Sequence, residues 1–176
     1  MTTLNVYKMF DNVTLPEYGT EDSACFDVRA NLTGTDVEYV NHNGSKKKLT
    51  KSIVPPGYSG NPVEEITLVK GDTVKVPTGL ILDIPTGYYV ELFIRSSSVW
   101  KKGLMMANST AIIDNDYVDE LFIMVQSISS YTTIVQGERL AQGRLVKYEK
   151  TPIQETVNKP VQKTDRIGGI GSTGRH

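Results

Sequence analysis

Cysteine is almost absent from this chain, since Cys25 is the only one among its 176 residues. An intrachain disulfide is therefore excluded, and a reducing, cytoplasmic location is expected. Histidine is nearly as scarce, and His42 and His176 stand far apart in the sequence. The composition thus indicates neither a metal site built from histidine and cysteine nor covalent catalysis by a cysteine with a base beside it.

Long hydrophobic runs and an excess of charge are missing as well. The longest apolar stretches, such as residues 121–125, are far too short to span a bilayer, and the N-terminus lacks the pattern of a signal peptide. We therefore expect a soluble protein without a membrane partner. Lysine and arginine total 19 against 20 acids, a formal net charge of −1. Binding along a nucleic-acid backbone is not expected, and an anionic ligand must be held by local groups.

Short β-type segments make up most of what the chain does have. Segments rich in β-branched and aromatic residues alternate with Pro-Thr-Gly turns. Strands are predicted over residues 74–76, 79–84, 88–94, 121–125 and 140–148. No long window carries a helical stripe, so the prediction is an all-β fold, an antiparallel sandwich or jelly-roll-like barrel. One short helix is predicted over residues 97–102, with serines at its start and Gly103 as a left-handed stop.

Two polar segments interrupt the β pattern. Residues 31–61 contain a lysine run and a Pro-Pro-Gly turn, and they indicate an insertion with long loops. Residues 149–176 contain Pro152 and Pro160 and end in a glycine-rich stretch, which is typical of a flexible arm. We expect a single β domain over residues 1–148, with 31–61 inserted, followed by a mobile C-terminal arm that could order on a ligand.

Several segments have residue types that suit phosphate chemistry, although each also has an ordinary structural explanation. Residues 95–98, Arg-Ser-Ser-Ser, could bind an anion at a helix start or simply cap the helix. Residues 168–174 could wrap a phosphate with backbone N–H groups or be plain flexible chain. Residues 114–120 crowd four acids into seven positions, where one could be a general base or all could belong to a polar turn.

Asp27 and Gln142 are two further candidates. Asp27 interrupts an apolar run, so it should either face solvent on an edge strand or meet a partner such as a hydrated metal. Gln142 could offer its amide to a ligand or sit on the outer face of its strand. Two phosphate-type elements and several acids, without a Walker A signature or a histidine–cysteine cluster, together point to a triphosphate held through Mg²⁺.

In their order along the chain, these segments resemble the five motifs of the trimeric dUTPase family. The matching positions are Asp27, residues 95–97, residues 108–117, residues 137–142 and residues 168–174. The resemblance implies a homotrimer that hydrolyses dUTP to dUMP and pyrophosphate with Mg²⁺, at sites on the subunit junctions. It covers nearly the whole chain apart from the insertion.

The resemblance also implies roles for individual residues. Asp114 would be the base that activates water for attack on the α-phosphorus, and Tyr117 would lie under the deoxyribose and exclude a 2′-hydroxyl. Asn108 and the nearby hairpin backbone would read the uracil, with Ile113 also in contact with the substrate. Asp27 would orient waters on Mg²⁺, with Gln142 beside it in the catalytic group. The expected phosphate-binding and closing residues are Arg95, Ser96, Ser97, Gln142, Arg166, Ile170, Ser172 and Thr173.

Two other functions stay open at this point. A dCTP deaminase has the same fold and a similar Arg-Ser-Ser motif, but its catalytic glutamate would fall ten residues after Asp114, where this chain has Met124. A regulatory binding protein on this scaffold would explain the insertion and Ile170, which replaces an aromatic residue of the family. Retention of Asp114, Tyr117 and Arg95 together favours catalysis.

Overall fold

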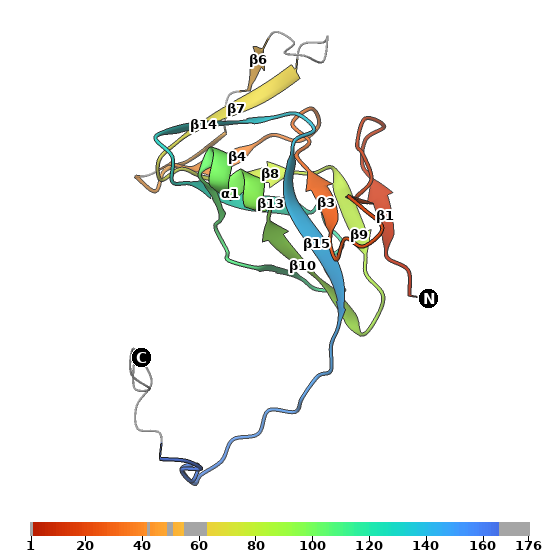
Figure 1. Ribbon diagram of the computed structural model, residues 1–176, viewed down its shortest axis with the longest axis vertical. Helices are drawn as coiled ribbons and strands as arrows, with labels where there is room; N and C mark the ends of the chain where they lie inside the picture. The colour runs from red at the N-terminus through yellow and green to blue at the C-terminus, as the bar shows by residue number, and fades with distance from the viewer. Residues whose placement is uncertain (1, 42, 49–50, 55–62, 166–176) are drawn as a thin grey trace.

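Antiparallel strands dominate the computed structural model, which describes residues 2–41, 43–48, 51–54 and 63–165 (Figure 1). The all-β prediction is confirmed, and all five predicted strands form with small shifts at their ends. The elements are β1 Asn5–Lys8, β2 Glu17–Tyr18, β3 Phe26–Arg29, β4 Glu38–Val40, β5 Lys46–Lys48, β6 Ser52–Val54, β7 Val63–Val69, β8 Thr73–Pro77, β9 Leu80–Asp83, β10 Tyr88–Ile94, α1 Ser96–Lys102, β11 Leu104–Met106, β12 Ala111–Ile113, β13 Phe122–Ser127, β14 Tyr131–Val135 and β15 Arg139–Lys147.

One sheet positions most of the candidate site residues. Among the described residues its strand order is β12-β10-β15-β3-β2, and every neighbouring pair is antiparallel. Successive side chains of a strand point to opposite faces, so Val90 and Leu92 of β10 are buried while Tyr89, Glu91 and Phe93 point to the outer face. That outer face joins the two halves of the site described below.

A second sheet, in the order β11-β13-β8-β4-β5, closes the core from the other side. Its inner face includes Ile123 and Val125 of β13 and Val74 and Val76 of β8, all fully buried. Burying a side chain of this size contributes about 1.5–3 kcal/mol, so this shared core is the main source of stability. Smaller pairings, β1 with β9 and β14-β7-β6, complete the described strands.

Strands also form inside residues 31–61, where the prediction of long loops is wrong for three segments. β4 pairs with β8 and with β5, and β6 pairs with β7. The register places Tyr39 opposite Val74, and Tyr39 packs against the core. The lysine run forms β5, at the end of its sheet's strand order. Polar composition predicted loops here because it does not reveal the partner strands.

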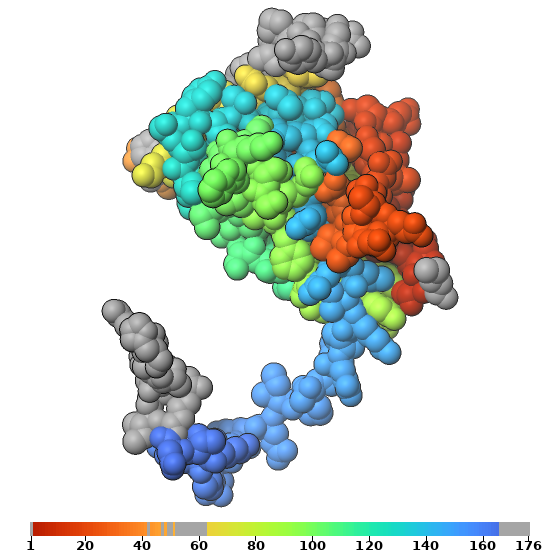
Figure 2. Space-filling view, viewed as in Figure 1, coloured from red at the N-terminus to blue at the C-terminus, as the bar shows by residue number. Residues whose placement is uncertain are grey.

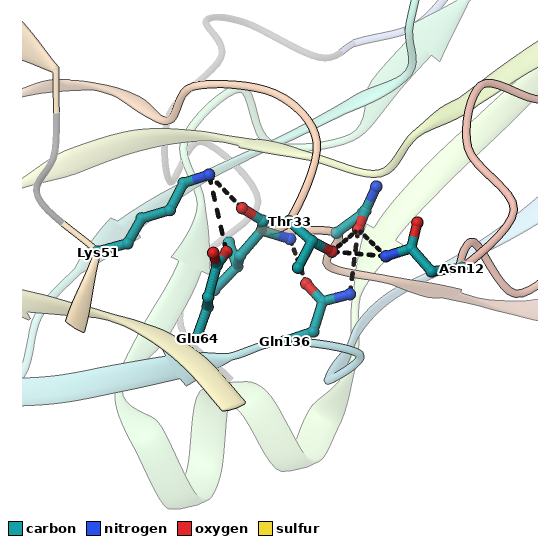
Figure 3. Close-up of polar contacts among 7 residues, drawn as sticks. Asn12, Thr33, Lys51, Glu64 and Gln136 are labelled. Atoms are coloured by element: carbon teal, nitrogen blue, oxygen red, sulfur yellow. Dashed lines mark hydrogen bonds and ion pairs between the residues drawn. The ribbon is translucent and has the colours of Figure 1, made fainter. Parts of the chain in front are cut away.

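A polar cluster attaches this region to the rest of the fold (Figure 3). The Nζ atom of Lys51 donates a hydrogen bond to the carbonyl oxygen of Leu32 and lies 3.8 Å from Glu64. The side-chain amide of Gln136 donates to the carbonyl oxygen of the buried Asn31 side chain at 3.0 Å. Asn12 and Thr33 complete the cluster through a bond of 2.6 Å. Segments far apart in the sequence are thereby joined by partly buried and exposed hydrogen bonds.

The predicted helix is confirmed as α1, although its serines do not cap it. Arg95 occupies the N-cap position with extended backbone and makes no capping bond through its side chain. Ser98 is buried, and its hydroxyl donates instead to the carbonyl oxygen of Leu140 at 3.1 Å. Gly103 ends the helix with φ 62°, a left-handed conformation that costs glycine little. The helix is therefore held by its buried side and its C-terminal cap.

The chain leaves the sheets after β15. Every residue from 149 to 165 is exposed, and Figures 1 and 2 show this segment standing clear of the strands. Ile153, Val157 and Val161 are among its exposed apolar side chains. Within the described ranges, no helix has the length and apolar character needed to cross a membrane.

Candidate active site

An acid lies between two arginines at one end of the site-bearing sheet. One carboxylate oxygen of Asp27 is 3.0 Å from Nε of Arg95, and the other accepts a hydrogen bond of 3.0 Å from Nη1 of Arg139. The side chain of Asp27 keeps only 15% of its surface exposed. β3 lies between β15 and β2, so Asp27 is not on an edge strand, and its partners in the described protein are cationic side chains. We call Asp27, Arg95, Ser96, Ser97 and Arg139 the arginine corner.

The groups around the arginine corner suit an anion. Ser97 and both arginines border a hollow of about 280 Å³, together with Ser98, Lys101, Lys102 and Glu138. Lys102 is already paired, since Glu138 lies 2.6 Å away and the carbonyl oxygen of Thr133 accepts its proton at 2.9 Å. Gln142 lies opposite Asp27 on one side and Phe93 on the other, which puts its half-buried side chain on the same outer face.

Arg139 is a functional candidate that sequence reasoning missed. A β-bulge between Arg139 and Ala141 shifts the pairing of β15 with β3. A bulge re-aims side chains relative to a regular strand, so counting back from Gln142 gives no indication of where Arg139 points. The sequence feature that could have indicated Arg139 is its position within residues 137–142, which resemble a family motif.

The second half of the site is the turn after β12. Asp114 is exposed and borders an open hollow of about 540 Å³ with Tyr89, Ile112, Asn115, Asp116, Tyr148 and Lys150. The backbone N–H of Tyr117 donates to the carbonyl oxygen of Asp114 at 3.2 Å and closes the turn. A carboxylate in this position is open to water and to a ligand, as a general base needs to be.

Tyr117 is fixed by its own turn. Its hydroxyl donates to the backbone carbonyl oxygen of Glu120 at 2.7 Å. Partial burial raises the pKa of Tyr117 above its ordinary value, and the charges of Asp119 and Glu120 add to that increase. The ring is therefore neutral and held in place before any ligand arrives.

Glu120 explains part of the acid crowding in this turn. The carboxylate is buried and accepts hydrogen bonds from the backbone N–H of Gly79 at 2.7 Å and from the hydroxyl of Thr35 at 2.9 Å. Glu120 is thus a structural acid that ties the turn to the loop before β9. Sequence alone did not separate it from Asp114.

Asn108 and Ile113 belong to the same hairpin but face differently. Asn108 is exposed, and the adjacent Ser109 has φ 64°, an uncommon conformation for a residue other than glycine. Strained backbone of this kind is concentrated at functional sites. The side chain of Ile113 packs against the core, whereas Ile112 is exposed and borders the hollow. The side chain of Ile113 is thus only partly exposed, which favours a substrate contact through its backbone.

One chain does not bring the two halves together. Ile113 pairs with Val90, so Asp114 emerges near Tyr89 at the start of β10, and Arg95 follows the other end of that strand. Arg95 lies six positions after Tyr89, which corresponds to about 20 Å along the strand at roughly 3.3 Å per residue. That span is longer than a triphosphate, so Asp114 and the arginine corner of the same chain cannot both reach one α-phosphorus.

An ion-pair network lies on the outer face between the two halves. Glu91 accepts hydrogen bonds from the hydroxyl of Tyr89 and from Nε of Arg144, both at 2.8 Å. These bonds lower the pKa of Glu91, with Tyr89 the larger cause and Arg144 the next. The Arg144 guanidinium also lies 5.7 Å from the centre of the Phe93 ring. No local sequence pattern indicates this network, because it depends on cross-strand register.

The donor set fits only one kind of metal binding. Within the described ranges, no three acidic, histidine or cysteine side chains gather as a metal-holding group. Asp27 is the acid beside the phosphate-type groups, and arginines contact both of its oxygens. Mg²⁺ keeps several waters and is commonly held by substrate phosphates with one or two carboxylates. These residues suit a hydrated metal that arrives with a triphosphate.

Four expected site residues lie outside the described part of the chain. They are Arg166, Ile170, Ser172 and Thr173.

Comparison with known proteins gives one consistent family. The family model for dUTPase matches residues 57–174. The deoxyuridine 5′-triphosphate nucleotidohydrolase of Fusobacterium nucleatum is 32% identical over 167 residues, which cover 94% of this chain and 92% of the relative. The enzyme of the same name from Chlamydia muridarum is 28% identical over 168 residues, or 95% of each chain.

A solved structure shows the same fold. The dUTPase of Staphylococcus bacteriophage 80alpha, determined with dUPNHPP, matches with a TM-score of 0.65 at 20% identity, covering 99% of both chains. This likeness confirms the predicted jelly-roll type of β fold.

Proposed function

The chain belongs to the dUTPase family, and on that premise we propose that it hydrolyses dUTP to dUMP and pyrophosphate at composite sites between copies of the chain. The observation that carries the composite site is the separation of Asp114 from the arginine corner by the length of β10. If one copy supplies the base and another copy supplies the phosphate-binding groups, the two can lie close together. A homotrimer, with three such junctions, satisfies this requirement by symmetry.

The arginine corner holds the phosphates. Arg95 offers a planar set of donors, Ser96 and Ser97 offer hydroxyls, and Gln142 offers an amide on the same face. Asp27 orients both arginines in the absence of nucleotide and would hold a hydrated Mg²⁺ through its waters. When bound, the metal neutralises phosphate charge, and the donors stabilise the charge that develops on the leaving pyrophosphate.

Asp114 supplies the base. Its carboxylate accepts a proton from a water molecule while the water oxygen attacks the α-phosphorus. The bond from that phosphorus to the bridging oxygen breaks, so dUMP keeps the attacking oxygen and pyrophosphate departs. Holding water and phosphorus in line is the main task of the site, because positioning accounts for much of the barrier reduction in such reactions.

Nucleoside selection falls to the hairpin. Tyr117 presents a ring fixed by its bond to Glu120, against which a deoxyribose fits and a 2′-hydroxyl does not. Asn108 and the backbone near Ile113 read the uracil edge. A site that pairs a base through buried hydrogen bonds rejects other bases strongly, since a mismatch leaves polar groups unpaired. In this proposal Arg166, Ile170, Ser172 and Thr173 of the arm close over the nucleotide. The cytoplasmic location stays a prediction.

A product assay tests the function directly. The full chain is incubated with dUTP, dCTP, dTTP or UTP, with and without Mg²⁺, and both pyrophosphate and ammonia are measured. Pyrophosphate from dUTP alone, dependent on Mg²⁺, is the expected result. Ammonia from dCTP would identify a deaminase instead, and binding of dUTP without any product would identify a regulatory protein.

A further inference from the structure

The helix beside the arginine corner carries an apolar surface that is left exposed within the described part of the chain. On α1, Ser98 and Lys102 face inward, held by Leu140 and by Glu138 with Thr133. Trp100 lies on the opposite side and keeps 90% of its surface exposed, and Val99, between the two sides, is 38% exposed. Trp100 is the only tryptophan of the chain. An indole is costly to leave in water and is enriched at the centres of protein interfaces.

This apolar surface and the phosphate-binding hydroxyls share one space. Val99, Trp100, Ser96, Ser97 and Lys101 border a single open hollow of about 670 Å³. Trp100 is four residues after Ser96 and three after Ser97, spacings that put all three on one helix face. A chain segment that enters this hollow to reach Ser96 therefore lies beside the indole.

The other half of the site carries a matching apolar residue. Val118 follows Tyr117 in the turn that holds Asp114, and it is 68% exposed. The proposed composite site requires this turn, from a second copy, to lie next to Ser96 and Arg95. Val118 must then come close to α1 of the copy that holds the phosphates.

We infer that Trp100 and Val99 of one copy form the docking surface for the hairpin turn 114–120 of a neighbouring copy, with Val118 against the indole. The inference rests on the proposed composite site, because only that arrangement brings the turn to α1. Trp100 is then a positioning residue: it touches no reacting atom, but it sets how far Asp114 of one copy stands from the arginine corner of the next.

The single tryptophan makes this contact observable in the full-length protein. Emission of Trp100 is recorded over a dilution series without nucleotide, while oligomer mass is followed by light scattering. The expected result is blue-shifted emission in the assembled protein, with a red shift that follows dissociation. Emission typical of a solvated indole in the assembled protein overturns the inference. So does a shift that occurs only after dUPNHPP is added, because the nucleotide or the arm would then be the cover.

Variants identify the contacting segment. Val118→Ala should red-shift Trp100 emission in the assembled protein, whereas Val69→Ala, which changes an exposed valine of β7, should leave it unchanged. Equal effects of the two changes would overturn the contact. Trp100→Ala should weaken assembly by about tenfold or more, as truncation of an interface aromatic commonly does, and Trp100→Phe should restore most of the loss.

The proposed function and the contact fail separately. Pyrophosphate release from dUTP with a solvated Trp100 removes the contact and leaves the activity. A covered Trp100 that responds to Val118→Ala, in a protein that releases no pyrophosphate, supports the contact and removes the activity.

Discussion

The Nε atom of Arg95 lies 3.0 Å from a carboxylate oxygen of Asp27, although the two residues are far apart in the sequence. Asp27 belongs to β3, and Arg95 is the N-cap residue of α1. The second oxygen of Asp27 is held by Arg139. Both arginines are therefore oriented before a nucleotide binds. An oriented donor loses less conformational freedom when a phosphate arrives, so in the proposed site Asp27 would raise affinity without touching the phosphate.

Asp27→Asn should lower both stability and turnover. Two guanidinium groups would lose a charged acceptor, at a cost of about 1–3 kcal/mol in the free energy of unfolding. The KM for dUTP should rise and kcat should fall, measured in the pyrophosphate assay. Arg139→Ala serves as the comparison, because it keeps the bond between Asp27 and Arg95 and should cost less stability. An Asp27→Asn protein with wild-type kinetics and stability would remove Asp27 from the site.

Asp114→Asn should abolish hydrolysis while leaving binding in place. The amide has nearly the same shape but cannot accept the proton of the attacking water, so kcat should fall by about 10²–10⁴-fold. Affinity for dUPNHPP, measured by calorimetry, should change little. Asp119→Asn, in the same turn, is the matched control and should keep its activity. Comparable losses in both variants would mean that the turn, and not one base, had been disturbed.

Tyr117→Phe separates the hydroxyl of Tyr117 from its ring. The variant loses the bond to the carbonyl oxygen of Glu120, at a cost of about 1 kcal/mol, but keeps a ring under the sugar. Discrimination against UTP should therefore survive in Tyr117→Phe and be lost in Tyr117→Ala. Competition between UTP and dUTP in the pyrophosphate assay measures this, and equal discrimination by all three proteins would mean that Tyr117 only packs.

Because the pKa of Tyr117 is raised, the difference in stability between the wild type and Tyr117→Phe should depend on pH. A folded pKa above the unfolded value means that the stabilisation is complete below the ordinary tyrosine pKa of about 10 and is lost as pH rises through the folded value. Thermal unfolding of the wild type and of Tyr117→Phe should therefore converge at strongly alkaline pH.

Much of the strand arrangement could be predicted because the sequence alternates. In residues 88–94 the buried Val90 and Leu92 alternate with outward side chains, which is the pattern of a strand with one face on the core. Gly103 likewise predicted the helix end correctly. The strands β4, β5 and β6 were not predicted, because short polar strands form only when a distant partner such as β8 or β7 is available.

Those parts of the candidate site that lie in recognisable sequence motifs could be predicted. The parts that depend on which residues face each other across neighbouring strands could not. Asp114, Arg95 and Asp27 stand out by residue type and order, and the structure places Asp27 and Arg95 in contact. Arg139 depends on a bulge, and the pairing of Glu91 with Arg144 depends on which residues of β10 and β15 face each other. Such cross-strand relations require the three-dimensional register, which no local pattern contains.

Glu91→Gln should weaken the protein most at neutral pH. Hydrogen bonds from Tyr89 and Arg144 lower the pKa of Glu91, so its stabilising effect is present above the ordinary carboxyl pKa and is lost as pH falls through the lowered value. The melting temperatures of the wild type and of Glu91→Gln should differ most at pH 7, where Glu91 is charged. They should converge in acid, where Glu91 becomes protonated. A constant difference across the pH range would show that the charge of Glu91 does not matter.

Glu120→Ala should disturb the turn that holds Asp114, through a residue that has only a structural role in the proposed site. The buried carboxylate holds the backbone N–H of Gly79 and the hydroxyl of Thr35. Its loss leaves one buried and one half-buried donor without this acceptor, at a cost of about 1–3 kcal/mol. The midpoint of urea unfolding should fall, and kcat should fall as well, because the turn loses its anchor on the core and Asp114 is held less well. Asp119→Ala changes the adjacent exposed acid and should leave both quantities near their wild-type values. The two acids are neighbours and differ mainly in burial, so equal effects of the two changes would contradict an anchoring role for Glu120. A fall in stability with unchanged kcat would show that Asp114 is positioned independently of Glu120.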